Sequence, residues 1–412
     1  MTPALRKRVP WGPTDRSVLT NVDGGVTAVD GVRAAGVMAG IKPSGNPDLA
    51  LVVLDGPGTV AVTATTNTFR APPVEVAVRN AADGHGRAVI VNAGNANAGT
   101  GAPGLADAQA VVDHTAKLLG IAASEVVPMS TGVIGVPLPM ERLLGALQSL
   151  VAALDANGGR AAAEAICTTD TVSKQVAFEV ADATGSCRVG AMAKGVGMLE
   201  PAMATMLCVA TTDAGVPANV LRAMTSRAVE RTFNRISVDG CGSTNDTVAV
   251  LAGGTAVAPP TMASLEIALE AAFADLALQM VHDGEGVTRV AHLRVTGAAT
   301  EYDAVALARA VAGSTLFRAA LWGADPNWGR VLAAMGTTEV AFDPSLVSVA
   351  FGGIQVCRDG TAATFDRGAV AAAMAATDVP IEIDLAAGGA AATFLTADLT
   401  PEYVRFNGEY TT

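Results

Sequence analysis

The sequence predicts a mixed α/β or α+β protein with a large core. Short valine-rich apolar runs indicate buried strands, as in LALVVLD at 49–55. Longer segments with apolar residues three and four positions apart indicate amphipathic helices, as at 105–119. The two patterns are mixed along a chain of 412 residues, of which 50% are hydrophobic and 16% charged. This length and order favour two or three domains built from helices and strands.

The first half of the chain is predicted to contain most of the strands. Up to about Gly45 no period is clear, and short strands and loops are expected there. The predicted strands then cover 49–55, 59–66, 74–79, 88–94, 175–181 and 188–192. Two helices are expected as well, and their apolar faces are Leu105, Ala108, Val112, Ala116 and Leu119 for one and Leu143, Leu147, Leu150 and Leu154, after Pro137, for the other.

The second half repeats this order in outline. A strand at 206–211 is followed by a helix that Pro217 opens, with Val220, Leu221 and Met224 facing inward. The remaining predicted elements are a loop at 239–246, strands at 247–252, 291–295, 347–351 and 381–385, helices at 265–281 and 304–321, and an apolar stretch at 392–395 before a polar tail.

Charge and cysteine content exclude several classes of function. The net charge of −12 argues against nucleic acid and anionic membranes as partners. The five cysteines form no CxxC pair, so neither a disulfide framework nor a metal site is indicated, and buried reduced thiols in a cytoplasmic protein are expected. The basic residues near Met1 are not followed by the apolar region of a signal peptide, and no apolar run is long enough to span a membrane.

The segment Lys194–Ala214, KGVGMLEPAMATMLCVATTDA, is the most informative part of the chain. Glycines and Pro201 break its first half, and Thr205 then stands directly before a buried strand. A threonine in that position is most often structural. It can act as a nucleophile only if a base removes its proton. A free N-terminal amine is such a base, and it is created if the chain is cut directly before Thr205.

This segment resembles the self-cleaving region of the ornithine acetyltransferases, which are the glutamate N-acetyltransferases of arginine biosynthesis. The similarity extends over nearly the whole chain in the same order. Its further motifs are GNANAGTG (94–101), STGVIGVPLPME (130–141), TTDT (168–171), STNDT (243–247), HDGEG (282–286), DPNWGR (325–330) and EYVRFNGEYTT (402–412). The resemblance implies an αββα sandwich, in which two sheets pack face to face between layers of helices.

The resemblance also implies that the precursor cleaves itself between Ala204 and Thr205. The products are residues 1–204 and residues 205–412, which stay together and form an assembly with two copies of each piece. Thr205 is then the nucleophile, and its new α-amine, with an unperturbed pKa of about 8, is the base for its own hydroxyl. Thr131 and Gly132 match the pair that forms the family's oxyanion hole, although a Thr-Gly pair alone is usually a turn.

Five further residues match the family's substrate-binding positions. Lys194 is expected to pair with a substrate carboxylate, although taken alone it would be a solvent-facing lysine. Glu285 is expected to bind the side-chain amine of a basic amino acid, although alone it would be an exposed acid after a helix. Thr168, Asn407 and the terminal Thr412 match polar contacts, and a polar tail would otherwise be frayed. His282 is interpreted as structural, since an N-terminal threonine needs no histidine base.

The function implied is transfer of acetyl from N-acetylornithine to glutamate through an acetyl-threonine intermediate. Neither a metal nor a bound cofactor is implied, and whether acetyl-CoA is a second donor is left open. The alternatives are a self-processed amidohydrolase or aminopeptidase, an antibiotic-pathway acyltransferase of the same fold, and a non-catalytic amino-acid-binding regulator. Two residues depart from the family pattern, Gly99 in place of a common cysteine and Glu200 in place of a small residue. Glu200 either alters the choice of acyl donor or lines the acceptor pocket, or it is a surface residue. GNANAGTG lacks the lysine of a phosphate loop, so nucleotide binding is not expected.

Overall fold

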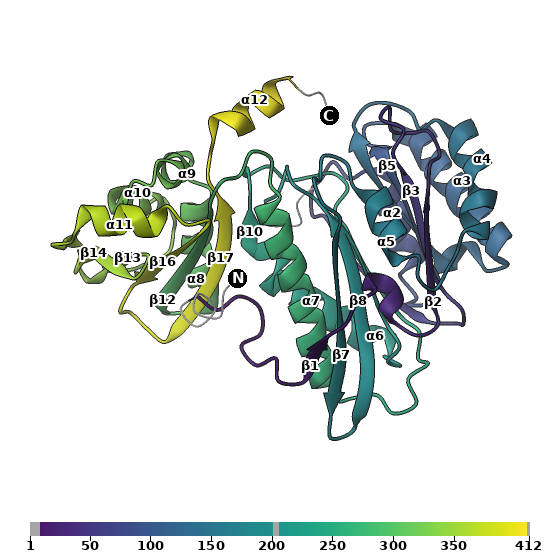
Figure 1. Cartoon of the computed structure of the whole chain (residues 1–412), viewed down its shortest axis with the longest axis horizontal. Coiled ribbons are helices and arrows are strands. Elements are labelled where there is room, and N and C mark those ends of the chain that lie inside the picture. The colour runs from purple at the N-terminus through teal and green to yellow at the C-terminus, as the bar shows by residue number, and fades with distance from the viewer. Residues whose placement is uncertain (1–8, 201–205, 410–412) are drawn as a thin grey trace. The chain divides into compact units, whose positions relative to one another are not determined.

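The computed structural model describes residues 9–200 and 206–409, and it divides into two compact units (Figure 1). Unit 2 is formed by residues 15–234 and 241–280. Unit 1 is formed by the segment before it, by residues 235–240 and by residues 281–410. Each unit therefore contains chain from both sides of the predicted cleavage point, and each is described by itself below.

Unit 2 contains two β-sheets. The strands of sheet A, in spatial order, are β1 (Leu19–Asn21), β7 (Lys174–Asp182), β8 (Gly185–Lys194), β9 (Leu207–Thr212), β11 (Thr247–Ala252) and β4 (Thr59–Ala64). The strands of sheet B are β2 (Val32–Val37), β3 (Leu49–Leu54), β5 (Ala88–Asn95) and β6 (Val126–Val133). The predicted strands at 49–55, 59–66, 88–94, 175–181, 188–192, 206–211 and 247–252 are confirmed.

A single hydrophobic core lies between sheets A and B. Val209 and Met192 come from sheet A, and Val52 and Val91 come from sheet B. The short alanine-rich helix α5 (Gly159–Ile166) contributes to the same core. Side chains of successive strand residues point to opposite faces of a sheet. The buried residues that alternate with these core residues therefore point to the outer face of each sheet, which must be covered by other elements.

Helices supply that cover. The outer face of sheet B packs against α3 (Gly101–Leu119) and α4 (Met140–Ala152), which confirms both predicted amphipathic helices. On the side of sheet A, α6 (Ala218–Arg231) packs on β4 and is joined to α7 (Met262–His282) by the ion pair Arg227–Glu266 at 2.6 Å. Unit 2 is thus built as helices, sheet, sheet and helices, which agrees with the predicted αββα sandwich.

Unit 1 is built on sheet C, whose strands are β10 (Ile236–Ser237), β17 (Ala390–Ala397), β12 (Val290–Ala298), β16 (Asp378–Asp384), β13 (Ser348–Phe351), β14 (Ile354–Arg358) and β15 (Thr361–Ala362). One face packs on α8 (Glu301–Ala312), α9 (Thr315–Trp322), α10 (Trp328–Met335) and α11 (Arg367–Met374). The tail forms α12 (Pro401–Glu409). The predicted strands at 291–295, 347–351 and 381–385 are confirmed, whereas α10 and α11 are not predicted from the pattern.

The predicted strand at 74–79 is wrong, because this segment lies in the helix α2 (Pro72–Asn80). The alternation in VEVAVR is typical of a strand, but two prolines directly before it occupy the first turn of a helix. Proline suits that turn, since its backbone angle is already helical and the turn needs no amide donors. Val74 and Ala77 then face the core, and Val78 stays 44% exposed.

The predicted single helix at 304–321 is also wrong in extent. It is interrupted at Gly313, and Ser314 begins α9 by accepting a hydrogen bond from the Phe317 amide. Among the described residues, no single helix has both the length and the apolar composition to cross a membrane. The bent pair α8 and α9 meets those criteria only when its two helices, 64° apart, are counted together.

Candidate active site

The start of β9 is the point in unit 2 where the predicted site residues gather. β9 lies between β8 and β11, and Leu207 is opposite both Lys194 and Thr247. The first residue of β9 therefore lies between the end of β8 and the start of β11. Ala204 and Thr205, the predicted cleavage residues, lie outside the described residues.

Lys194 and Thr131 are brought into contact. Lys194 ends β8, its residue is 3% exposed, and its Nζ donates a hydrogen bond to Thr131 Oγ1 at 3.3 Å. Thr131 lies near the end of β6 and is 2% exposed. The solvent-facing alternative for Lys194 is wrong, because both side chains are buried at the edge of the space between the two sheets.

Gly132 is required by the packing of β6 against β5. Its φ of +129° is rarely adopted by other residues, and a side-chain carbon there would lie 2.3 Å from the Gly94 carbonyl carbon. Such an approach is impossible for any residue with a Cβ. The glycine of the STG motif is thus needed for its close approach to the first residues of GNANAGTG, and this packing requirement exists with or without an oxyanion-hole role.

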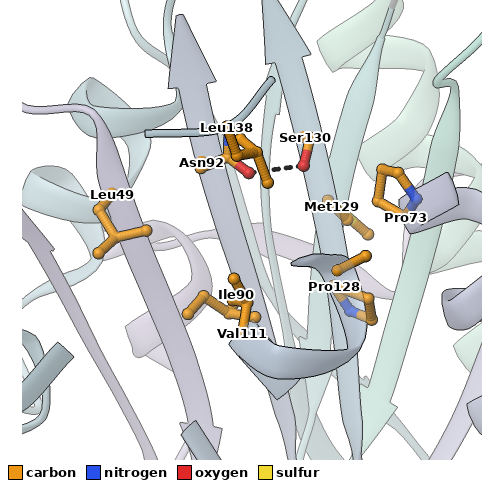
Figure 2. A pocket seen from close by; sticks show the side chains of 10 residues that line it. Leu49, Pro73, Ile90, Asn92, Val111, Pro128, Met129, Ser130 and Leu138 are labelled. Carbon is orange, nitrogen blue, oxygen red and sulfur yellow. Dashed lines mark hydrogen bonds between the residues drawn. The ribbon is translucent and has the colours of Figure 1, made fainter. Parts of the chain in front are cut away.

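Ser130, the neighbour of Thr131, belongs to a different environment. Its hydroxyl donates to Asn92 Oδ1 at 2.5 Å, and Figure 2 shows the two side chains pointing toward each other in a mostly apolar pocket. That pocket is lined by Ile90 of sheet B and Val111 of α3. The alternation of side chains along β6 therefore directs Thr131, and not Ser130, toward Lys194.

A second small pocket contains the predicted oxyanion-hole pair. Its lining residues are Ala96, Thr131, Gly132, Ile134, Met198, Ser243, Thr244 and Asn245. The side-chain nitrogen Nδ2 of Asn245 donates hydrogen bonds to the backbone carbonyl oxygens of Ala96 at 2.7 Å and Ser130 at 2.9 Å. Asn245 thereby fixes the STNDT loop against β6. The motifs GNANAGTG, STG and STNDT, distant in sequence, form one wall.

Asp170 connects two predicted substrate-binding residues. Its Oδ2 accepts a hydrogen bond from the Thr168 amide at 3.0 Å, and its Oδ1 accepts one from the amide of Gly195, directly after Lys194, at 2.9 Å. Its Oδ1 also pairs with Lys174 Nζ at 2.7 Å, and the side chains of this ion pair are both 0% exposed. Burial alone would raise the pKa of Asp170, but the two lysines and these hydrogen bonds lower it to about 2.

Three lysines lie near this carboxylate, and the carboxyl groups of Asp48 and Asp246 lie near two of them. Burial lowers the pKa of Lys194 and of Lys42, and in each case the nearby Asp170 opposes that change. Burial, with a further contribution from Asp170, raises the pKa of the Cys167 thiol to about 11, so this cysteine stays protonated and is a poor nucleophile. Three lysines around Asp170 suit the binding of a further anionic group.

Glu285 and Asn407 lie in unit 1, where they contact each other. Asn407 Nδ2 on α12 donates to Glu285 Oε2 at 3.0 Å, and Asn407 is exposed while Glu285 is half-buried. The loop that carries Glu285 is fixed by α12, since Thr400 Oγ1 donates to the Gly286 carbonyl at 2.9 Å. The predicted contact Thr412 lies outside the described residues.

His282 takes part in a cluster elsewhere in unit 1. Its Nε2 lies 3.1 Å from Asp378 Oδ1, which also contacts Nε2 of the buried His292 at 2.7 Å. The two imidazoles hold the pKa of Asp378 well below its usual range, although burial alone would raise it. Within the described part of the chain, no group of three or more His, Cys, Asp or Glu side chains could hold a metal ion.

Residues 33–412 match the ArgJ family. The chain belongs to the ArgJ family. It is 46% identical over 389 residues to the arginine biosynthesis bifunctional protein ArgJ of Thermobifida fusca, covering 94% of this chain and 100% of that protein. It is 44% identical over 393 residues to the protein of the same name from Parasynechococcus marenigrum, covering 95% and 96%.

A solved structure is similar to part of this ArgJ family chain. It is an ornithine acetyltransferase complexed with ornithine, from Mycobacterium tuberculosis. The two are 44% identical with a TM-score of 0.42, and the match covers 44% of this chain and 98% of that one.

Three polar residues of the site were not selected from the sequence. Asp170 and Asn245 stand within TTDT and STNDT, motifs in which only Thr168 was assigned a role, and Lys174 follows the first of them. The spacing of Asp170 and Lys174, four residues apart, allows an ion pair, and such a pair must form if both side chains are buried. The sequence gives no sign of that burial, because β7 begins at Lys174 itself.

Proposed function

We propose that this chain is the glutamate N-acetyltransferase, or ornithine acetyltransferase, of arginine biosynthesis. The observation that carries the proposal is the 46% identity to an arginine biosynthesis bifunctional protein over 94% of the chain. Identity at this level over the whole length includes the segments that form the wall around Thr131 and Lys194. The substrates are accordingly small amino acids and their N-acetyl derivatives.

The reaction proceeds through an acetyl ester of Thr205. In the precursor, the Thr205 hydroxyl attacks the Ala204 carbonyl, and water opens the resulting ester to free the Thr205 α-amine. In each turnover this amine accepts the hydroxyl proton while the hydroxyl oxygen attacks the acetyl carbon of N-acetylornithine. The carbon–nitrogen bond breaks, and the amine of ornithine leaves with that proton. The amine of glutamate then attacks the ester, which regenerates the hydroxyl and forms N-acetylglutamate.

Thr131, Gly132, Thr168 and Lys194 serve this chemistry from unit 2. The buried Lys194 ammonium, 3.3 Å from Thr131 Oγ1, is supported as the partner of the α-carboxylate that donor and acceptor share. The Thr131 hydroxyl and the Gly132 amide are proposed to stabilise the oxyanion at the acetyl carbon. Donors that are fixed before the substrate arrives are the most effective in this role, and Asn245 and Asp170 fix the segments that carry them.

Glu285, Asn407 and Thr412 are proposed to hold the rest of the substrate. The Glu285 carboxylate suits the side-chain amine of ornithine. Asn407, which donates to Glu285 at 3.0 Å, would orient that carboxylate.

Cleavage is proposed to leave the two pieces associated. β8 precedes the cleavage point and β9 follows it, yet the two strands pair along six residue positions from Val189–Thr212 to Lys194–Leu207. An assembly with two copies of each piece and a cytoplasmic location complete the proposal. The use of acetyl-CoA as a second donor is a separate question that the same assay answers.

The test is incubation of the purified protein with N-acetylornithine, with and without glutamate. N-acetylglutamate formed only with glutamate supports transfer. Release of acetate with or without glutamate supports an amidohydrolase, and no turnover supports a binding protein. Thr205→Ala should give a folded, uncut chain of 41.2 kDa without transferase activity. Thr212→Ala, at the far end of β9, is the control and should be cut normally. An active wild-type chain that remains uncut would contradict the mechanism.

A further inference from the structure

Asp246 is a buried carboxyl group that the mechanism above does not use. It is the fourth residue of the STNDT motif, directly before β11, and it is 0% exposed. Its Oδ1 accepts a hydrogen bond from the Met206 amide at 2.9 Å. Its Oδ2 is buried too and accepts no hydrogen bond from the described residues. A buried carboxyl oxygen without a partner is costly, so this atom is suited to a group that the described residues do not supply.

The amide that Asp246 holds is the first one after the predicted nucleophile. Only two carbon atoms, those of the Thr205 backbone, separate the Met206 nitrogen from the Thr205 α-nitrogen. A carboxyl group fixed at Met206 therefore has the α-amine of the mature chain as a close covalent neighbour. Lys194 reaches the start of β9 from the opposite strand, β8, so the two charged groups approach it from different sides.

We infer that Asp246 is a positioning residue of the acyl-transfer centre, whose carboxyl group fixes the Met206 amide and provides the buried acceptor for the Thr205 α-amine. The inference rests on the proposed function, because that amine exists only after cleavage. When the amine takes the proton of the Thr205 hydroxyl, it becomes an ammonium. A carboxylate beside it stabilises this ammonium until the proton passes to the leaving amine of the donor.

Burial and the lysines near Asp246 disfavour a further positive charge at this point. Burial raises the pKa of Asp246 well above its usual range, and the Met206 amide, the Ser243 hydroxyl and Lys194 partly oppose this. The charged and titratable groups near Lys194 are Asp170, Cys167, Lys174 and Asp246 itself, and Lys42 lies near Asp170. The carboxyl groups of Asp170 and Asp246 favour one, and of these two Asp246 is the one that contacts the Met206 amide.

Asp213 provides a matched control at the other end of β9. It is 7% exposed, and its Oδ1 accepts a hydrogen bond from the Arg188 amide at 2.7 Å. Burial raises its pKa as well. Asp213 therefore shares the burial and the backbone contact of Asp246, but it directly follows β9 and lies at the opposite end of that strand from Met206.

The experiment measures kcat/KM for acetyl transfer against pH in wild type, Asp246→Asn and Asp213→Asn, each as the full chain. An asparagine at 246 keeps an oxygen for the Met206 amide but removes the negative charge. We expect the acid limb of the Asp246→Asn profile to move to lower pH by about one unit or more, because the ammonium loses its partner. We also expect kcat to fall about tenfold or more. Asp213→Asn should keep the wild-type limb, and an unshifted limb in Asp246→Asn would overturn the inference.

A measurement on the wild-type chain decides the matter if Asp246→Asn does not fold or is not cut. Competitive labelling of the mature N-terminus with isotopic acetic anhydride gives the pKa of the Thr205 α-amine. A buried amine without a carboxylate partner is expected to have a pKa below the unperturbed value of about 8, so a value at or above 8 supports the carboxylate. A value clearly below 8 overturns the inference. Labelling needs only cleavage, so it remains decisive even if wild type fails to transfer acetyl to glutamate and the proposed function is wrong.

Discussion

The residues predicted to hold the substrate are built in two different ways. In unit 2, the segments of Thr168 and Lys194 are attached to Asp170, whose ion pair with Lys174 is 0% exposed on both sides. In unit 1, the half-buried Glu285 accepts a hydrogen bond of 3.0 Å from the exposed Asn407. A buried charge must be paired to be tolerated, whereas a surface contact contributes little to folding. Stability and substrate binding are therefore coupled around Asp170 in unit 2, and they are separable at Glu285 in unit 1.

The largest effect is expected from Asp170→Ala. It removes the carboxylate that forms the ion pair with the buried Lys174 and that accepts hydrogen bonds from the Gly195 and Thr168 amides. Removing one partner of a buried ion pair typically costs about 3–5 kcal/mol. We expect a loss of that order in the free energy of unfolding, measured by urea denaturation, together with loss of transferase activity. Glu285→Ala is the matched carboxylate deletion in unit 1, and it should cost less than about 0.5 kcal/mol. Equal losses in the two variants would remove the contrast between the groups.

Acid provides a second way to test the buried group. The pKa of Asp170 is lowered to about 2 in the folded chain, against about 3.9 when unfolded. The unfolded chain therefore binds the proton first, and on the order of 2 kcal/mol of stability is present above pH 4 and lost as the pH falls from about 4 to 2. Urea denaturation of wild type and Asp170→Asn at several pH values measures this loss. The variant should show a weaker dependence in that window, and curves of identical slope would contradict the predicted linkage.

An effect mainly on substrate binding is expected from Lys194→Met. Methionine fills a similar volume and is well tolerated in a buried position. A hydrogen bond to a charged group is worth about 1.5–3 kcal/mol, so we expect KM to rise roughly 10- to 100-fold for donor and acceptor alike. Equilibrium binding of N-acetylornithine and of glutamate to the Thr205→Ala chain measures this without turnover. If both bind as tightly as before, Lys194 does not hold the carboxylate they share.

Much of the fold could be predicted because most strands are buried on both faces. A strand such as β9, in which all residues from Leu207 to Thr212 are buried, is a continuous apolar run that the sequence displays directly. Local signals failed where two of them conflicted. The alternation in VEVAVR indicates a strand, but Pro72 and Pro73 begin a helix, and the prolines decide the outcome. The arrangement of strands in each sheet could not be predicted, since it depends on contacts between residues far apart in sequence.

The candidate site was predictable as a set of residues but not as an arrangement. Motif similarity selected Thr131 and Lys194, which are 63 positions apart and in contact. It did not select Asp170, Lys174 or Asp246, whose importance comes from burial. A polar residue becomes conspicuous only when its surroundings are apolar, and a single sequence does not show those surroundings. The role of Thr205 is a prediction for the assay described above, and the roles of Thr412 and Glu200 are predictions from motif similarity.

The smallest effect is expected from Glu285→Gln. Glutamine keeps an oxygen for Asn407 but loses the charge that attracts an amine. We expect binding of N-acetylornithine to weaken by about 1 kcal/mol, roughly fivefold, because the contact is partly exposed. N-acetylnorvaline, which lacks the side-chain amine, should bind the variant and wild type equally. Glu402→Gln on α12, where Glu402 is an exposed acid paired with Arg405, is the control and should change neither ligand. Calorimetry with both ligands measures the difference, and equal weakening of the two by Glu285→Gln would assign this carboxylate a role in the fold of the HDGEG loop instead of in recognition of ornithine.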